Sequence, residues 1–132
     1  MGEALILETT FLVDLEREAR GGVPGRAHAF LEAHPDCPLC ITLTTAGELA
    51  CGPRIEDREA WSRLVSRFRV LTPDLDASWS YGQTFRYLAD NGLLIGANDL
   101  WIAAVALAHG LPVVTRDEAH FRRVPGLRVL GY

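Results

Sequence analysis

The stretch NDLWIAAVALAHGLPVVTRD, residues 98–117, decides the fold of this chain. Its first part, residues 98–110, is apolar on almost every side of a helix, which predicts a central and buried helix. Asn98 is the expected N-cap of this helix, and Gly110 is the expected C-cap. The apolar run inside it, LWIAAVALA, is too short to span a bilayer.

The second part of the stretch is a short apolar strand, residues 111–115, which Asp117 follows by two residues. A helix that leads into a strand starts near the edge of the sheet where that strand finishes. Asp99, in the first turn of the helix, and Asp117 are therefore expected at the same edge of a sheet.

Strands and helices alternate along the rest of the chain. Apolar runs predict strands at residues 4–7, 39–43, 69–71, 111–115 and 127–130. Helical periodicity predicts helices at residues 9–20, 26–34, 44–52, 57–68, 76–92, 98–110 and 117–124. This alternation predicts a single domain over residues 1–132, an α/β fold in which a mostly parallel central sheet lies between two helical layers. Such sheets bind ligands at the carboxyl ends of their strands.

Composition excludes several classes of protein. Of the 132 residues, 48% are hydrophobic and 23% are charged, as in a folded globular domain. The chain has no basic residue before its first apolar run, so we expect no signal peptide and a cytoplasmic protein without a membrane segment. The net charge of −4 gives no overall signature of nucleic-acid binding, although residues 116–132 hold four Arg and two acids, a local charge of +2.

Four acids stand near the expected carboxyl ends of strands: Glu8, Glu48, Asp99 and Asp117. Each has an ordinary structural interpretation when taken alone. Acids at helix N-termini are favoured by the helix dipole, Thr45 and Glu48 have the spacing of a capping box, and Asp117 can cap the short helix that follows it. Taken together, crowded carboxylates raise one another's pKa and destabilise a fold. A bound Mg²⁺ or Mn²⁺ would remove this penalty, and such a site suggests phosphoryl chemistry.

Three segments carry a resemblance to a known family. They are LILETTFLVDL (residues 5–15), ITLTTAGELACG (residues 41–52) and GANDLWIAAVALAHGLPVVTRDEAHFRRVPGLRVL (residues 96–130). With these segments the chain resembles the PIN-domain ribonucleases nearly end to end, specifically the VapC-like toxins of bacterial toxin–antitoxin pairs. The resemblance implies a single PIN-like domain that cuts single-stranded or loop RNA with Mg²⁺ or Mn²⁺ and a metal-activated water. It also implies homodimers, and inhibition by an antitoxin whose tail lies across the active site.

The resemblance also assigns roles to individual residues. The four acids Glu8, Glu48, Asp99 and Asp117 would be the catalytic, metal-binding carboxylates, and Thr10 and Thr115 would support them. Our own candidates for RNA phosphate contacts are Arg116, Arg122 and Arg123. A solvated charged turn is an equally good interpretation of these arginines. His120 is expected to pack with Phe121 against the core rather than to act as a base.

Glu8 departs from the family pattern, in which this position is Asp. Glu is longer by one methylene, roughly 1.5 Å of reach, so the strand end or the ion must shift, or a water must intervene. We expect metal binding to survive, with weaker affinity or a preference for Mn²⁺. The alternative function is a PIN-fold module that binds RNA or protein with weak or no catalysis because of Glu8.

Two further classes of protein are disfavoured by particular residues. Cys37 and Cys40 form a C-x-x-C pair, but zinc needs four ligands and a thioredoxin-type pair opens a helix, whereas this pair precedes a strand. Small buried side chains are the simpler interpretation. Phosphoacceptor signalling domains resemble one another in using a Lys near the phosphoryl group. This class is disfavoured because all 13 basic residues here are Arg.

Overall fold

One parallel sheet lies at the centre of the molecule. The computed structural model describes residues 2–132, and within these residues the strands are β1 (Leu5–Leu7), β2 (Leu39–Thr42), β3 (Arg69–Leu71), β4 (Val113–Val114) and β5 (Val129–Leu130). They pair in the order β3-β2-β1-β4-β5, and every pairing is parallel. The carboxyl ends of all these strands therefore meet at one edge of the sheet, as the alternation in the sequence predicts.

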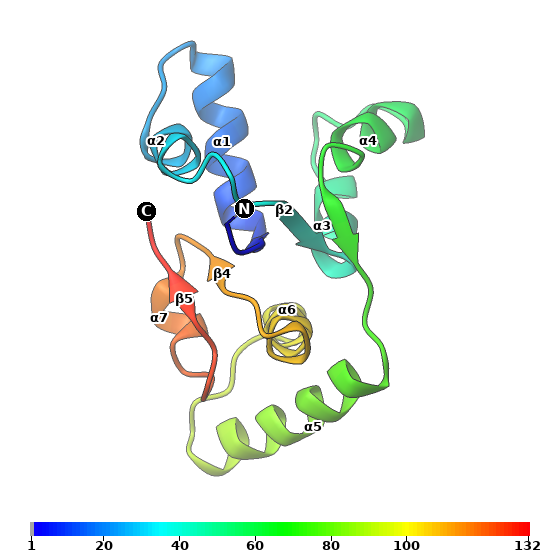
Figure 1. The fold of residues 1–132 in the computed structure, drawn as a ribbon. Coiled ribbons are helices and arrows are strands. Elements are labelled where there is room, and N and C mark those ends of the chain that lie inside the picture. The colour runs from blue at the N-terminus through cyan, green and yellow to red at the C-terminus, as the bar shows by residue number, and fades with distance from the viewer. Residues whose placement is uncertain (1) are drawn as a thin grey trace.

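Helices cover both faces of the sheet, which confirms the predicted three-layer α/β/α fold. They are α1 (Thr9–Gly21), α2 (Arg26–Ala33), α3 (Leu43–Ala50), α4 (Arg58–Val65), α5 (Leu75–Asp90), α6 (Ala97–His109) and α7 (Glu118–Phe121). Figure 1 shows α1 and α2 on one side of the strands and α5 and α6 on the other. None of the helices in residues 2–132 is both long and apolar enough to cross a membrane.

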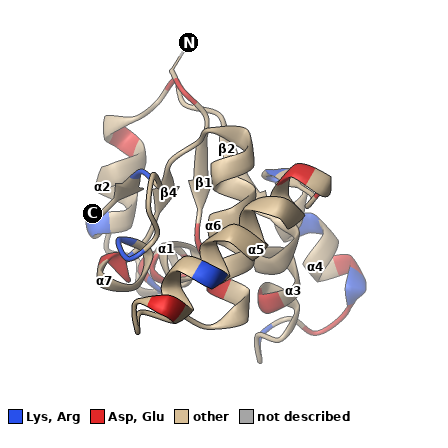
Figure 2. Ribbon diagram, turned by 90° about the horizontal axis from the view of Figure 1, so that it is seen from below, with Lys and Arg blue, Asp and Glu red and all other residues tan. Residues whose placement is uncertain are grey.

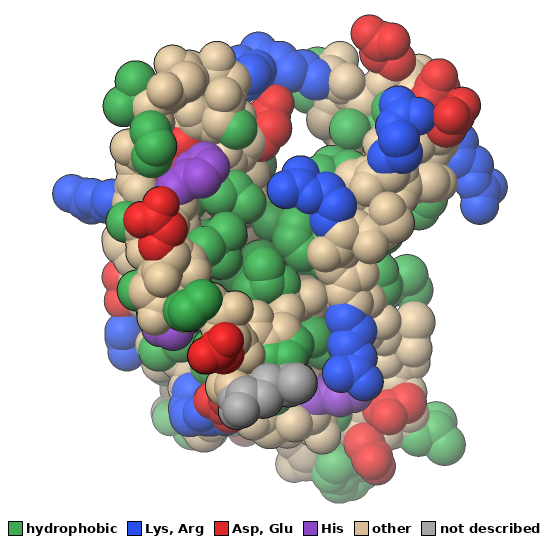
Figure 3. All heavy atoms as spheres, turned by 45° about the horizontal axis from the view of Figure 1, so that its top comes forward, with side chains coloured by type: hydrophobic (Ala, Val, Ile, Leu, Met, Phe, Trp, Pro, Cys, Tyr) green, Lys and Arg blue, Asp and Glu red, His purple; other side chains and the backbone are tan. Residues whose placement is uncertain are grey.

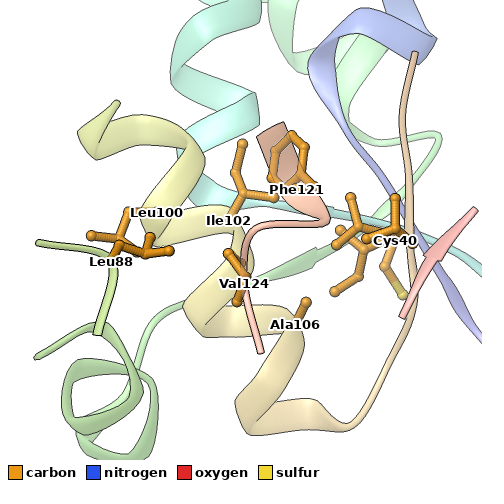
Figure 4. Packing of buried hydrophobic residues seen from close by; sticks show 11 residues of the cluster. Cys40, Leu88, Leu100, Ile102, Ala106, Phe121 and Val124 are labelled. Atoms are coloured by element: carbon orange, nitrogen blue, oxygen red, sulfur yellow. The ribbon is translucent and has the colours of Figure 1, made fainter. Parts of the chain in front are cut away.

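Alternate residues of β1 point into two apolar clusters, one on each face of the sheet. Ile6 points into a cluster with α5, α6 and the segment around α7, part of which Figure 4 shows. Leu5 and Leu7 point into a second cluster, with α1, α2 and α3. Successive side chains of a strand point to opposite faces, so this run of apolar residues fits a strand that is buried on both sides.

Helix α6 is the buried element that the sequence predicts. Residues 102–106 are all buried, and the helix closes at Gly110, whose φ of 63° lies in the left-handed region that glycine adopts without strain. The N-cap, however, is Gly96 and not Asn98. The helix starts at Ala97, so Asp99 still lies in its first turn.

Other predicted boundaries differ because side chains cap helices earlier than expected. Thr42 is the N-cap of α3, and its hydroxyl accepts a hydrogen bond from the backbone N–H of Thr45 at 3.2 Å. The strand predicted at residues 39–43 therefore ends at Thr42, and the predicted capping box of Thr45 and Glu48 is wrong. The two strands after α6 are also shorter than predicted, with two residues each.

Candidate active site

Glu8 joins the end of β1 to the start of α1 and to the end of β4. Its Oε2 accepts the backbone N–H of Thr10 at 2.9 Å, so Glu8 is the N-cap of α1. Its Oε1 accepts the hydroxyl groups of Thr10 at 2.8 Å and Thr115 at 2.6 Å. The residue is only 3% exposed. Glu8 is therefore both a helix cap and a carboxylate fixed at the sheet edge.

Glu48 reaches the same region from α3. The hydroxyl of Thr9 donates to Glu48 Oε1 at 2.7 Å and also lies 3.1 Å from the hydroxyl of Thr45. This contact of Thr9 was not among the contacts predicted from the sequence. A signal for Thr9 was present in the sequence, because two hydroxyl residues, Thr9 and Thr10, follow Glu8. Consecutive residues at a helix start point to different sides, so one hydroxyl can meet Glu8 and the other Glu48.

Asp99, Asp117 and His120 form the group best placed to hold an ion. Among residues 2–132, these three side chains bring one potential ligand atom each within 4.8 Å of one another. His120 Nδ1 lies 2.6 Å from Asp117 Oδ2, and the backbone N–H of Asp117 donates to Thr115 Oγ1 at 2.9 Å. Figure 2 shows acidic segments at the end of β1, on α3 and at α7, near this edge.

His120 does not take the place that the sequence analysis expected. Its side chain is 46% exposed and faces Asp117, whereas Phe121 is fully buried in the core. The expectation that His120 packs with Phe121 is therefore wrong. The expected cap at Asp117 is also not formed, because that side chain makes no capping hydrogen bond to α7.

The charges of the other three acids all act on Asp99. Burial raises its pKa first, the charges of Glu8, Glu48 and Asp117 raise it further, and His120 acts in the opposite direction. The resulting pKa is about 6. Like charges that share a site disfavour the ionised form, and a divalent cation would relieve this cost. Carboxylate oxygens suit Mg²⁺ and Mn²⁺.

The three arginines proposed to contact RNA all have partners within the chain. Arg116 pairs with Asp14 at 2.7 Å, and Arg122 pairs with Glu118 at 2.7 Å. Arg123 donates to the carbonyl of Leu94 at 3.1 Å. About half of the Arg116 and Arg122 side chains remains exposed, 54% and 57%.

A largely apolar groove begins beside the acids and runs between α1, α2, α3 and α4. Its volume is about 600 Å³, and Thr9 and Glu48 belong to its lining. Figure 3 shows this hollowed, mostly hydrophobic surface with arginine side chains around it. The groove is not predictable from the sequence, because it depends on how four helices pack.

Within residues 2–132, neither cysteine of the C-x-x-C pair belongs to a group of side chains placed to hold a metal ion. Cys40 belongs to the apolar core and is 1% exposed, and both Cys37 and Cys40 are free. Burial raises the pKa of the Cys40 thiol, which keeps it in its neutral form. The simpler interpretation, small buried side chains, holds for Cys40.

Comparisons with known proteins agree with this geometry. The family model of the PIN domain matches residues 5–127. Ribonuclease VapC1 of Rickettsia felis is 32% identical over 129 residues, which cover 96% of this chain and 94% of that protein. The tRNA(fMet)-specific endonuclease VapC of Salmonella typhimurium is 40% identical over 98 residues, which cover 69% of this chain and 73% of that protein.

A solved structure extends the comparison to the fold. A chain of the toxin-antitoxin complex from Klebsiella pneumoniae superposes with a TM-score of 0.70 at 25% identity, over 94% of this chain and 95% of that one. The family match spans almost all of the chain, from β1 to the segment before β5. The chain therefore belongs to the PIN domain family and, within it, to the VapC ribonucleases.

Proposed function

We propose that this VapC ribonuclease hydrolyses RNA phosphodiester bonds at the edge of the sheet, with Mg²⁺ or Mn²⁺ bound by Asp99, Asp117 and His120. The observation that carries the proposal is the convergence of these three side chains within 4.8 Å, next to Glu8 and Glu48. A divalent ion bound there would polarise the phosphate and lower the pKa of an attacking water.

The chain's own residues would orient the reactants. Asp99 and Asp117 supply oxygen ligands, and Glu48, held by Thr9 at 2.7 Å, is a further acid at the mouth of the site. The carboxylate of Glu8 is held at the start of α1 by two hydroxyls and a backbone N–H. This arrangement supports a site that tolerates Glu in place of Asp.

We further propose that the protein acts in the cytoplasm as the toxin of a toxin–antitoxin pair. Support comes from the similarity to a chain of a toxin-antitoxin complex and from the groove of about 600 Å³ that ends at Thr9 and Glu48. An antitoxin segment that lay in this groove would reach the acids and block them. The exposed Arg122 and the half-buried Arg123 would contact RNA phosphates only after they exchange their present partners.

We also propose that the protein forms a homodimer. Helix α5 presents Leu75 and Trp79 to solvent, 88% and 69% exposed. Exposed apolar side chains on one helix are typical of an interaction surface. Sedimentation of the wild type and of Trp79→Arg would test this, with a loss of dimer expected in the variant.

Cleavage of a structured RNA, with the initiator tRNA as the first probe, tests the nuclease proposal. We expect cleavage by the wild type with Mg²⁺ or Mn²⁺, and none without metal. Asp99→Asn should lose activity, while Asp90→Asn, the same change at the exposed end of α5, should retain it. Equal cleavage by the wild type and Asp99→Asn would exclude the acid site as the catalytic centre.

Glu8→Asp separates the nuclease from the alternative of a binding module, which the ribonuclease relatives do not favour. We expect Glu8→Asp to cleave within a few-fold of the wild type. Activity in Glu8→Asp alone would show that the natural residue has weakened catalysis and would support the alternative.

A further inference from the structure

Asp14 is a buried carboxylate that the proposed chemistry does not use. It lies on α1 and is 4% exposed, on the side of the helix that faces the core. Its Oδ1 accepts from the guanidinium groups of Arg17 and Arg116, the latter at 2.7 Å. Its Oδ2 accepts the hydroxyl of Tyr132 at 2.6 Å. A buried charge with so many donors is stable only while the donors stay in place.

The partners of Asp14 connect it to the candidate active site. Arg116 stands between Thr115, which donates to Glu8, and Asp117. The backbone N–H of Arg116 donates to Thr10 Oγ1 at 3.1 Å. Arg116 is therefore fastened twice to α1, by its backbone at Thr10 and by its side chain at Asp14.

Tyr132 donates to the second carboxylate oxygen of Asp14. Its ring packs edge-on against Phe11, with the ring centroids 4.8 Å apart. Burial and the hydrogen bond to Asp14 raise the pKa of the Tyr132 hydroxyl, so this hydroxyl remains a donor at any ordinary pH. Its bond goes to Oδ2, whereas the bond to Arg116 goes to Oδ1, so the two links can be removed separately.

We propose that Asp14 is a positioning residue: by holding the Arg116 side chain against α1, it fixes the loop that presents Thr115 and Asp117 to the metal site. The inference rests on the proposed function, because it concerns how that site is held. The loop between β4 and α7 is short, and its backbone is tied to α1 through the Arg116 N–H and Thr10. The link from the Arg116 side chain to Asp14 is a second tie to α1, and it limits the movement of the loop further.

Mn²⁺ affinity, measured by calorimetry on the full chain, tests this link directly. Asp14→Asn removes the charge of the pair and Arg116→Ala removes the donor, so both weaken the same link, and each should weaken Mn²⁺ binding about tenfold, as outer partners of metal ligands do. The double variant should bind Mn²⁺ no more weakly than either single variant, because residues that act through one contact are not additive. In cleavage assays Asp14→Asn should lower kcat and leave KM unchanged.

Tyr132→Phe is the matched control, because it removes a donor from Asp14 and leaves the Arg116 pair intact. It should lower the melting temperature and keep Mn²⁺ affinity within about twofold of the wild type. Wild-type Mn²⁺ affinity in a folded Asp14→Asn protein would overturn the proposal and leave Asp14 a structural residue. If Asp14→Asn does not fold, Arg116→Ala decides in the same way.

The failure of this inference is distinguishable from a failure of the proposed function. A wild type that binds no Mn²⁺ overturns the metal site itself, and with it the positioning role. A wild type that binds Mn²⁺ as tightly as Asp14→Asn and Arg116→Ala overturns the positioning role alone. Additive losses in the double variant would also overturn it, because the two residues would then act separately.

Discussion

Two acids, Glu18 near the end of α1 and Asp99 in the first turn of α6, have opposite surroundings. Glu18 accepts backbone N–H groups of Gly25, Ala27 and His28 at the start of α2, and its Oε1 lies 2.7 Å from the His28 ring. Burial acts to raise its pKa, but these hydrogen bonds outweigh burial and lower the pKa to about 2. Glu18 is thus fully satisfied within the fold and ties α1 to α2.

Asp99 lies in the first turn of α6 but among other acids. Burial and the charges of Glu8, Glu48 and Asp117 raise its pKa to about 6. The difference lies in their partners, because Glu18 accepts the free N–H groups at the start of α2, whereas the neighbours that shift the pKa of Asp99 are mostly acids. The fold supplies the positive partners of Glu18 and leaves those of Asp99 to be supplied from outside, which is the expected property of a cation site.

The largest expected effect comes from Asp117, a proposed metal ligand in the acidic site around Asp99. Asp117→Asn should lower kcat/KM at least about 100-fold, because even the outer partners of metal ligands cost 10–100-fold. The measurement is RNA cleavage under single-turnover conditions. Glu118→Gln changes the next acid, which pairs with Arg122 on the surface, and should retain activity. Equal losses in both variants would contradict a specific role for Asp117.

A smaller effect is expected at Thr115, which joins Glu8 to Asp117. Thr115→Val removes the 2.6 Å donor to Glu8 and the acceptor of the Asp117 N–H. We expect roughly tenfold weaker Mn²⁺ binding and a loss of about 1–3 kcal/mol in the free energy of unfolding, because buried Glu8 loses a partner. Calorimetry and urea unfolding measure the two effects. Thr115→Ser keeps the hydroxyl and should restore both, and unchanged Mn²⁺ affinity in Thr115→Val would exclude this role.

Glu18→Gln should change stability and leave the site intact. The pKa of Glu18 is lower in the folded state than its ordinary value, so ionised Glu18 stabilises the fold at neutral pH. We expect a lower melting temperature at pH 7, with the difference from the wild type narrowing as the pH falls from 4.5 towards 2. Mn²⁺ affinity should not change. A variant that melts with the wild type at pH 7 would show that the donors around Glu18 contribute little.

The smallest effect has the opposite sign. The pKa of Asp99 is raised in the folded state, so its ionisation destabilises the metal-free fold. Asp99→Asn should therefore raise the melting temperature without metal at pH 7–8. The gain should shrink as the pH falls from about 6 towards 4, where Asp99 in the wild type is protonated. Thermal melts in chelator test this, and a lower melting temperature in Asp99→Asn at pH 8 would contradict the account.

The fold was predictable because its determinants are local. Buried apolar runs, helical periodicity and Gly110 identify the strands, the helices and the end of α6. Parallel connection then brings Glu8 and Asp117 to one edge, since strand ends in such a sheet lie together. Side-chain caps were less predictable, as Thr42 and Gly96 show, because several residues near each helix start could act as caps.

The rest of the site depends on contacts between distant segments. In the sequence, Asp14 is one polar residue of an amphipathic helix. Only the packing of the final residues shows that its carboxylate accepts from Tyr132, which lies 118 positions later in the chain. The contact of His120 with Asp117 depends on the turn before α7. Tertiary packing decides such contacts, and a single sequence carries no signal for them.

The most direct test of the account is a calorimetric titration of Mn²⁺ into the wild type, Asp99→Asn and Glu18→Gln at pH 7.5. The account predicts saturable binding by the wild type and by Glu18→Gln, and a loss of at least about 100-fold in affinity in Asp99→Asn. Equal Mn²⁺ affinity in the wild type and Asp99→Asn would contradict it, because Mn²⁺ would then bind without the Asp99 carboxylate.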